Sequence, residues 1–357
     1  MAKTDRTDLF SNRVRIFSFI LTVLVIWIHA VQPSLVYPEG TAGAGLWIML
    51  QRVLGTYLGQ IAVPGFFALS GYLFFRNADR AADDPAAYFG AKLKSRVRTL
   101  AVPYLLWNLI YYMIYLAAGR AELSVPFVLK SIFLYYCNPV FWYLKQLIVI
   151  TALAPVLWLL LIKDRSTAPV LVGLFFLAVF YDLLPVHPVN EDALFYYACG
   201  TAAALHCRTF VENTAEAGIA VPKRWRRIML CSAAAFFLLH MMALWGAKYG
   251  FVRMSIAGAV GCRICGIIAL FALLSSCGAG TKRTPKYMEY NFFVYATHYL
   301  ELRLVQKIAG AAGSGPLVSS LLYLLMPGLC ICLSVAAGRI MQKYAPAAFR
   351  LLTGGRD

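Results

Sequence analysis

Residues 14–31 read VRIFSFILTVLVIWIHAV, and this apolar stretch decides the fold that we predict. Basic side chains lead into it, and a single imidazole, His29, stands near its other end. On a helix, Arg15, Ser18, Thr22 and His29 share one face because they are three, four and seven residues apart. Ionisable groups at membrane depth usually face a bundle interior or a watery cavity. The stripe indicates a polar site, and an anchoring helix with one hydrogen-bonded histidine is the alternative.

The composition identifies an integral membrane protein. Of the 357 residues, 61% are apolar and only 14% are charged, which soluble domains do not combine. The formal net charge is +17, but the basic residues cluster between the apolar spans. In that position they indicate the orientation of the spans in the membrane and not a nucleic-acid-binding surface. The nine cysteines lie mostly within apolar spans and predict neither a metal site nor a disulfide framework.

Apolar runs of about 17 to 25 residues mark the membrane spans. We therefore predict an all-α polytopic membrane protein with about ten transmembrane helices. They cover residues 14–31, 53–75, 101–118, 140–162, 167–183, 193–208, 228–247, 254–276, 291–309 and 317–338. Residues 124–139, just before the fourth span, are predicted as a re-entrant or interfacial piece or as a further crossing. The long apolar run near the amino end predicts an uncleaved first helix and not a signal peptide.

Charge gives these spans a direction. With the amino end inside, the inner segments and Arg15 at the inner end of the first span together contain 24 of the 33 Lys and Arg residues. Because positive residues favour the cytoplasmic side, we expect both termini to be cytoplasmic. No polar stretch is long enough to bury a core of its own, so residues 1–357 are expected to form one integral-membrane domain.

His29 is the first candidate for chemistry. In the predicted topology it lies toward the outer side of the first helix, about 21 Å from Arg15 at the inner end. A neutral imidazole is well matched to taking a proton from a hydroxyl near neutral pH.

Two further motifs stand on the second span and before the third. Ser70 and Gly71 interrupt an aromatic helix (VPGFFALSGYLFFR), which suits either close helix packing or a ligand. Arg96 and Arg98 belong to the basic run KLKSRVR, which serves either positive-inside anchoring or the binding of a phosphorylated donor from the cytosol.

The last candidates lie farther along the chain. Trp142 suits an interfacial aromatic belt, and Lys145 follows it at the start of a span, able to line a cavity. His298 and Glu301 are three residues apart and predict a hydrogen-bonded pair, either structural or catalytic. Arg263, deep in the eighth span, is expected to point inward and to meet a carboxylate or a ligand phosphate. Hydrolase, nucleotide-binding and metalloprotease motifs are missing from the sequence.

In this order, several stretches resemble the acyltransferase family 3 membrane proteins, which include bacterial O-acetyltransferases of surface polysaccharides. The matching segments are RIFSFILTVLVIWIHA, FFALSGYLFFR, the basic run leading to RVRTLAVPYLLWN, FWYLKQLIVITALAP, FYYACGTAAAL and NFFVYATHYLELRL. They sample nearly the whole chain.

The resemblance implies acetyl-CoA as a cytoplasmic acyl donor and an acceptor met toward the outer side. His29 aligns with the family's catalytic histidine, and Arg96 and Arg98 with its basic residues before the third span. Many members have an arginine where this chain has Ser18; Arg15, one turn earlier, is the expected substitute.

The leading hypothesis is transfer of an acyl group, most simply acetyl, to a hydroxyl of an envelope glycan or lipid-linked sugar in a bacterial inner membrane. His29 would act as general base. Arg15, Arg96, Arg98, Arg263 and Ser70 would bind the donor, and Ser18, Trp142, Lys145, His298 and Glu301 would bind the acceptor or support the site. A transporter or flippase without chemistry is one alternative, and an acyltransferase for a small amine or amino acid is another.

Overall fold

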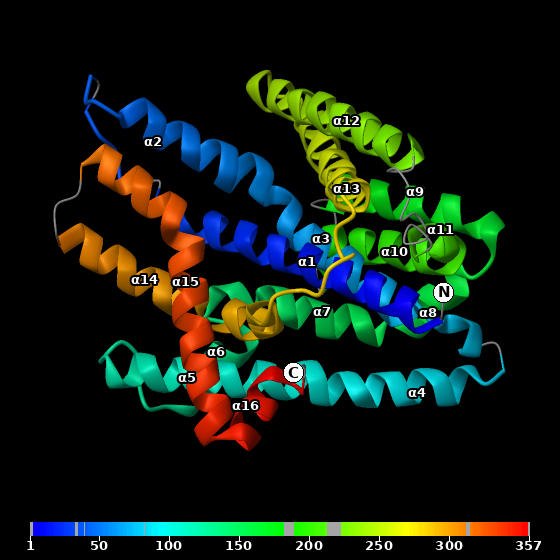
Figure 1. Cartoon of the computed structure of the whole chain (residues 1–357), viewed down its shortest axis with the longest axis horizontal. Coiled ribbons are helices and arrows are strands. Elements are labelled where there is room, and N and C mark those ends of the chain that lie inside the picture. Colours follow the sequence, from blue (N-terminus) through cyan, green and yellow to red (C-terminus); the bar gives the residue numbers. More distant parts are fainter. Residues whose placement is uncertain are drawn as a thin grey trace. The chain divides into compact units, whose positions relative to one another are not determined.

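We describe the chain from a computed structural model, which covers residues 3–32, 35–38, 40–81, 83–181, 189–212, 223–311 and 315–355. These residues form helices joined by short connections and contain no strand (Figure 1). The all-α membrane fold that we predicted is therefore confirmed for the described part of the chain.

Contacts divide the chain into two compact units, each built from three separate stretches. The first unit contains residues 1–18, 63–93 and 149–284, and the second contains residues 19–62, 94–148 and 285–357.

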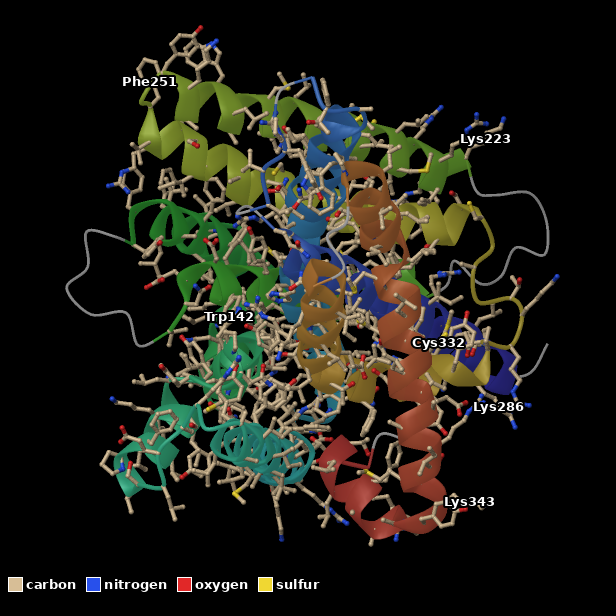
Figure 2. The ribbon with its side chains drawn as sticks, turned by 90° about the vertical axis from the view of Figure 1, so that its left-hand side faces the viewer. Trp142, Lys223, Phe251, Lys286, Cys332 and Lys343 are labelled. Carbon is tan, nitrogen blue, oxygen red and sulfur yellow. The ribbon has the colours of Figure 1, made fainter. Side chains whose placement is uncertain are left out.

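The first unit is built around two sets of helices. In one set, α12 (Lys223–Lys248) packs along α13 (Val252–Ser276), as Figure 1 shows. The turn between them uses Gly250 in the left-handed conformation (φ 79°), and Figure 2 shows Phe251 at this turn. The two helices approach closely because small residues meet: a Cβ at Gly258 would lie 2.8 Å from the backbone nitrogen of Ala243.

The unit also contains α10 (Glu191–His206), together with further helices. They are the first part of α1 (Lys3–Ala30), most of α3 (Ala62–Phe75) and α4 (Pro85–Arg96), the end of α7 (Trp142–Ala152), α8 (Ala154–Leu161), α9 (Asp164–Phe180) and α11 (Arg208–Glu212). Of these, α3, α8, α9 and α11 contact α10. Gly71 of α3 and Gly200 of α10 are fitted against the opposite backbone, because a Cβ on either would overlap a carbonyl oxygen, that of Tyr197 or of Ala68. This contact supports the packing interpretation of the Ser70–Gly71 pair.

The second unit contains the carboxyl-terminal part of α1 and the last three helices of the chain. It contains α2 (Ala44–Leu50), a π-helical turn η1 (Gln51–Leu58), η2 (Gly59–Ile61), a second π-helical turn η4 (Val97–Ala101), α5 (Val102–Ala117), α6 (Val125–Phe133), η5 (Pro139–Phe141), the start of α7, η8 (Lys286–Tyr290), α14 (Asn291–Ala311), α15 (Pro316–Tyr344) and α16 (Pro346–Thr353). Its core joins buried side chains of α1, α14 and α15, such as Ile26, Leu302 and Met326. Figure 2 labels Cys332 and Lys343 on α15.

Within the described residues, six helices are long and apolar enough to cross a membrane, and the bent pair 139–152 and 154–161 makes a seventh if it forms one span. The other three predicted spans fall on α9 and α10, with 17 and 16 residues, and on α14, which contains Glu301, Arg303 and Lys307. Helices α9 and α10 are too short, and α14 contains too many charged residues, to count among the candidate membrane spans. The six to seven spans show an integral membrane protein, and ten crossings with cytoplasmic termini remain a prediction.

The stretch that we left open, residues 124–139, contains only the nine-residue helix α6, capped by the Ser124 side chain. At 1.5 Å per residue it is roughly 14 Å long, which is about half of a hydrocarbon core. It is therefore too short to form a further crossing.

Candidate active site

His29 occupies the last turn of α1 and faces α14 of the second unit. Its ring lies 5.6 Å from the ring of His298 and 6.2 Å from that of Tyr299, measured between centroids. The two histidines are 269 positions apart in the sequence, so only the packing of α1 on α14 brings them together.

His298 is fully buried and has a defined tautomer. Its Nδ1 lies 2.7 Å from the carbonyl oxygen of Tyr295, which can only accept, so Nδ1 carries the hydrogen. Its Nε2 has no hydrogen-bond partner among the described residues. A buried polar atom left in this way is uncommon in proteins and marks a place where a ligand or water completes the contact. The site thus offers two imidazoles, one of them with an unused acceptor.

Glu301 does not pair with His298, so the hydrogen-bonded pair that we predicted is wrong. Its carboxylate accepts from the Ser334 hydroxyl of α15 at 2.8 and 3.0 Å. Residues three apart on a helix differ by about 60° around its axis, which is enough to turn one side chain toward α1 and the other toward α15. Glu301 therefore joins α14 to α15, and the imidazole pair has no carboxylate partner within the described chain.

The face of α14 beyond His298 was missed by the sequence reasoning. Tyr299 accepts hydrogen bonds from Nε and Nη2 of Arg303 at 3.3 and 3.0 Å, and Gln306 donates to the Ala30 carbonyl at 3.4 Å. Positions 299, 303 and 306 repeat at helical spacing, so a polar stripe was visible in the sequence. The stripe begins at Tyr299, which contacts the His29 ring, and runs toward the carboxyl end of α14.

Arg98 lies in a cavity of about 710 Å³ with a residue that the sequence reasoning did not select, Arg350. Arg98 is on the π-helical turn η4, and Arg350 is on α16. Gly354, in the left-handed conformation (φ 68°), ends α16 so close to Thr99 that a Cβ would lie 2.6 Å from the Thr99 carbonyl oxygen. Trp107 donates to the Leu352 carbonyl at 3.0 Å, which anchors α16.

Arg96 lies at the end of α4, beside η4. Lys145 of α7 donates to the carbonyl of Phe133 at 2.8 Å and so holds the end of α6. Trp142, labelled in Figure 2, is the first residue of α7. Lys145 therefore acts on the protein backbone in this structure.

The remaining candidates belong to the first unit. Arg15 donates to the Thr284 hydroxyl at 2.8 Å, and the Ser18 hydroxyl donates to the Arg15 carbonyl at 3.0 Å. Arg263 forms an ion pair with Asp192 at 2.8 Å, which is the carboxylate partner that we considered for it. Ser70 lies on α3, beside Gly71.

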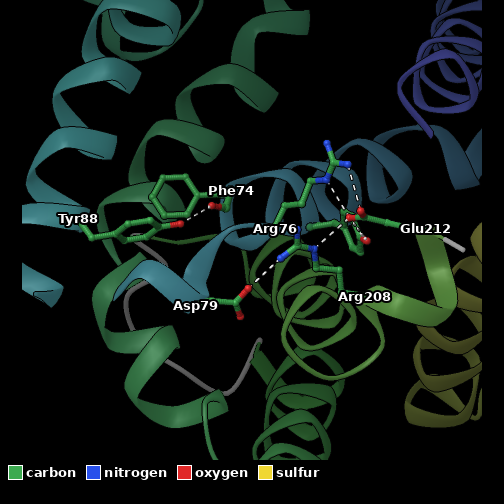
Figure 3. A network of polar contacts seen from close by, with 7 residues as sticks. Phe74, Arg76, Asp79, Tyr88, Arg208 and Glu212 are labelled. Atoms are coloured by element: carbon green, nitrogen blue, oxygen red, sulfur yellow. Dashed lines mark hydrogen bonds and ion pairs between the residues drawn. The ribbon is translucent and has the colours of Figure 1, made fainter. Parts of the chain in front are cut away.

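A further polar network in the first unit joins the end of α3 to α11 (Figure 3). Arg76 binds both carboxylate oxygens of Glu212, at 2.8 and 3.1 Å, and Arg208 forms an ion pair with Asp79 at 2.9 Å. Burial opposes ionisation of Glu212, but the hydrogen bonds and charge of Arg76 outweigh it and lower the pKa of this carboxyl. The network fixes the segment that follows α10.

This fold and this site define a class: a polytopic helical membrane protein in which a half-buried histidine at the end of the first helix lies beside a buried histidine of α14. The family is shown by comparison with known proteins. Residues 17–339 match the model of the acyltransferase domain of acyltransferase family 3, and the chain belongs to this family. The family resemblance that we drew from the sequence is thereby confirmed.

A curated relative is the succinoglycan biosynthesis protein ExoH of Rhizobium meliloti (strain 1021). It is 25% identical over 374 aligned positions, which cover 97% of this chain and 92% of the relative. No solved structure matches the chain.

Proposed function

We propose that this membrane acyltransferase moves an acyl group, in the simplest case acetyl, from cytoplasmic acyl-CoA to a hydroxyl of an extracytoplasmic or lipid-linked glycan in a bacterial inner membrane. The observation that carries the proposal is the His29–His298 pair, which has no carboxylate partner in the described chain. Membership of the family supports acyl transfer, and the name of the succinoglycan relative supports a glycan acceptor.

The proposed step needs one base. His29 takes the proton of the acceptor hydroxyl as its oxygen attacks the thioester carbonyl; the carbon–sulfur bond then breaks, and the coenzyme A thiolate takes the proton from His29. His298 would orient the His29 ring, since its own Nδ1–H is held by the Tyr295 carbonyl.

Arg98 and Arg350 of the second unit support the proposed binding of the acyl donor. Acyl-CoA carries several phosphate groups, and arginine binds phosphate through planar, charge-assisted hydrogen bonds. Arg98 and Arg350 line one cavity, and we expect both residues to lie on the cytoplasmic side of the membrane. Their two guanidinium groups fit the phosphate groups of acyl-CoA. Arg15, Arg96, Arg263 and Ser70 remain the other proposed donor contacts, although Arg263 would first have to leave Asp192.

The test is transfer of label from acetyl-CoA to envelope glycan by purified protein in proteoliposomes. His29→Ala should lower the rate by about 10² to 10⁴, the usual contribution of a positioned acid or base. His240→Ala removes a histidine of α12 that stacks on Phe236 and serves as the matched control.

Full transfer by a normally folded His29→Ala protein would contradict the assignment. Transfer of the label to an amine, and not to a sugar hydroxyl, would indicate that the acceptor is a small amine. Movement of an unmodified sugar across the membrane, with no label transferred, would favour a transporter.

A further inference from the structure

Two adjoining cavities lie at the carboxyl-terminal end of α1, entirely within the second unit. Their volumes are about 180 Å³ and 410 Å³, and both are lined by Gln32, Leu35 and Trp47. The larger one alone falls within the range of about 300 to 1,000 Å³ that is typical of small-molecule sites. It also borders the π-helical turn η1, an irregularity that often marks functional positions.

The smaller cavity is lined by Ala30, the residue that follows His29, and not by His29 itself. Gln306 of α14, which donates to the Ala30 carbonyl, also lines it. Gln306 lies on the same stripe of α14 as Tyr299, which contacts the His29 ring. Seven residues separate Gln306 from Tyr299, a rise of roughly 10 Å along the helix. Gln306 therefore joins the cavity to the face of α14 that contacts His29, about two helical turns away.

The walls of these cavities are held by hydrogen bonds. The backbone N–H of Gln32 donates to the Oε1 of Gln51 at 2.7 Å, which fixes the Gln51 carboxamide at the side of the larger cavity. The indole N–H of Trp47 donates to the Leu35 carbonyl at 3.1 Å. The Trp47 ring also packs edge-on against Tyr37 and Tyr323. Both polar and aromatic walls are thus preorganised, as a binding site requires.

The chemistry of the lining is that of a sugar site. Side-chain amides both donate and accept hydrogen bonds, as sugar hydroxyls do, and Gln32, Gln51 and Gln306 supply three of them. Trp47 and Tyr37 add aromatic surface for the apolar C–H face of a sugar ring. The lining described here contains no carboxylate and one guanidinium, that of the exposed Arg52.

We infer that these adjoining cavities bind one sugar residue of the acceptor glycan and present its hydroxyl to His29. The inference rests on the proposed acyl transfer and names the place where the acceptor is recognised. Gln32 and Gln51 are specificity-determining residues in this assignment, whereas the donor phosphates bind elsewhere.

The test is a kinetic comparison in proteoliposomes with labelled acetyl-CoA and polysaccharide from cells that lack this protein. Gln32→Met keeps the backbone N–H that holds Gln51 and removes only the side-chain amide. Gln51→Glu keeps the acceptor oxygen and replaces the amide donor. Each substitution should raise the acceptor concentration for half-maximal rate about tenfold and leave that for acetyl-CoA unchanged.

The control is Gln342→Met, at the far end of α15, where Gln342 bonds Tyr290. It should change neither value. Wild-type acceptor dependence in both cavity variants would overturn the inference while acyl transfer stands. Failure of the wild-type protein to transfer label to any polysaccharide would instead refute the proposed function and the inference with it.

Discussion

At the scale of single residues, neighbours decide what each polar side chain does. Arg263 and Arg98 are both candidates for binding the donor, yet Arg263 is paired with Asp192 whereas Arg98 lines a cavity. A cation that already has a carboxylate gains less from a phosphate, because binding must first break the existing pair. Arg98 and Arg350, the arginines of the second unit, are therefore better candidates than Arg263 for binding the donor phosphates.

Substitution of Arg350 tests this assignment. Arg350→Glu should raise the acyl-CoA concentration for half-maximal rate at least tenfold, because a charge-assisted hydrogen bond contributes about 1.5 to 3 kcal/mol. The acceptor concentration for half-maximal rate should not change. Lys343→Glu, an exposed charge reversal near the end of α15, is the control. Equal acyl-CoA dependence in both variants would remove Arg350 from the donor site.

The Arg76–Glu212 ion pair makes stability depend on pH. Since the folded protein lowers the pKa of Glu212 below its ordinary 4.5, the pair stabilises above that pH and loses its effect as pH falls through the lowered value. Glu212→Gln should lower the free energy of unfolding by about 1 to 2 kcal/mol at pH 7 and by much less at pH 3.

Thermal unfolding in detergent at the two pH values measures this difference. The matched control is Glu122→Gln, an exposed carboxylate whose loss should matter little at either pH. A Glu212→Gln deficit of the same size at pH 3 and pH 7 would show that the charge of this carboxyl is not the source of the stability.

At the scale of elements, close backbone approaches set the packing of α3 on α10. Gly200→Ala should destabilise the protein by about 1 to 3 kcal/mol, because the new methyl group overlaps the Ala68 carbonyl and backbone cannot move aside cheaply. Gly90→Ala, on an open face of α4, has no atom within 4 Å of the new Cβ and should be neutral or slightly stabilising. Unfolding temperatures of the two variants check this; equal values would contradict it.

Irregular helices also determine where the cavities lie. The π-helical turns η1 and η4 contribute Gln51 and Arg98 to two separate cavities of the second unit. A π turn widens the helix and shifts the side chains that follow it, so a 3.6-residue pattern does not place them. For this reason the sequence identified Arg98 as a candidate but not the cavity around it.

At the scale of the whole molecule, sidedness can be tested with single cysteines. In a background without the exposed native cysteines, Glu122→Cys should react with a membrane-impermeant maleimide in intact cells. Ala91→Cys, in the basic segment before the third span, should react only after permeabilisation. The opposite pattern would reverse the predicted orientation, and labelling of both positions in intact cells would contradict the number of crossings between them.

The sequence by itself determined the all-helical membrane class of the protein and its family, and it predicted His29 as the base. These depend on composition, on helical spacing and on short motifs, all of which are local properties of the chain. It also predicted a His298–Glu301 pair, which spacing alone could not decide, because neighbouring positions on one helix can turn toward different partners.

Only the tertiary structure decided which side chains meet. It placed His298 beside His29, Arg350 in one cavity with Arg98, and Gln306 at the cavity that Ala30 of α1 also lines. The partners in each pair are more than 250 residues apart in the sequence, and helix crossing angles depend on how whole side-chain surfaces interlock. Because this interlocking depends on many contacts made at the same time, it cannot be predicted from a single stretch of sequence.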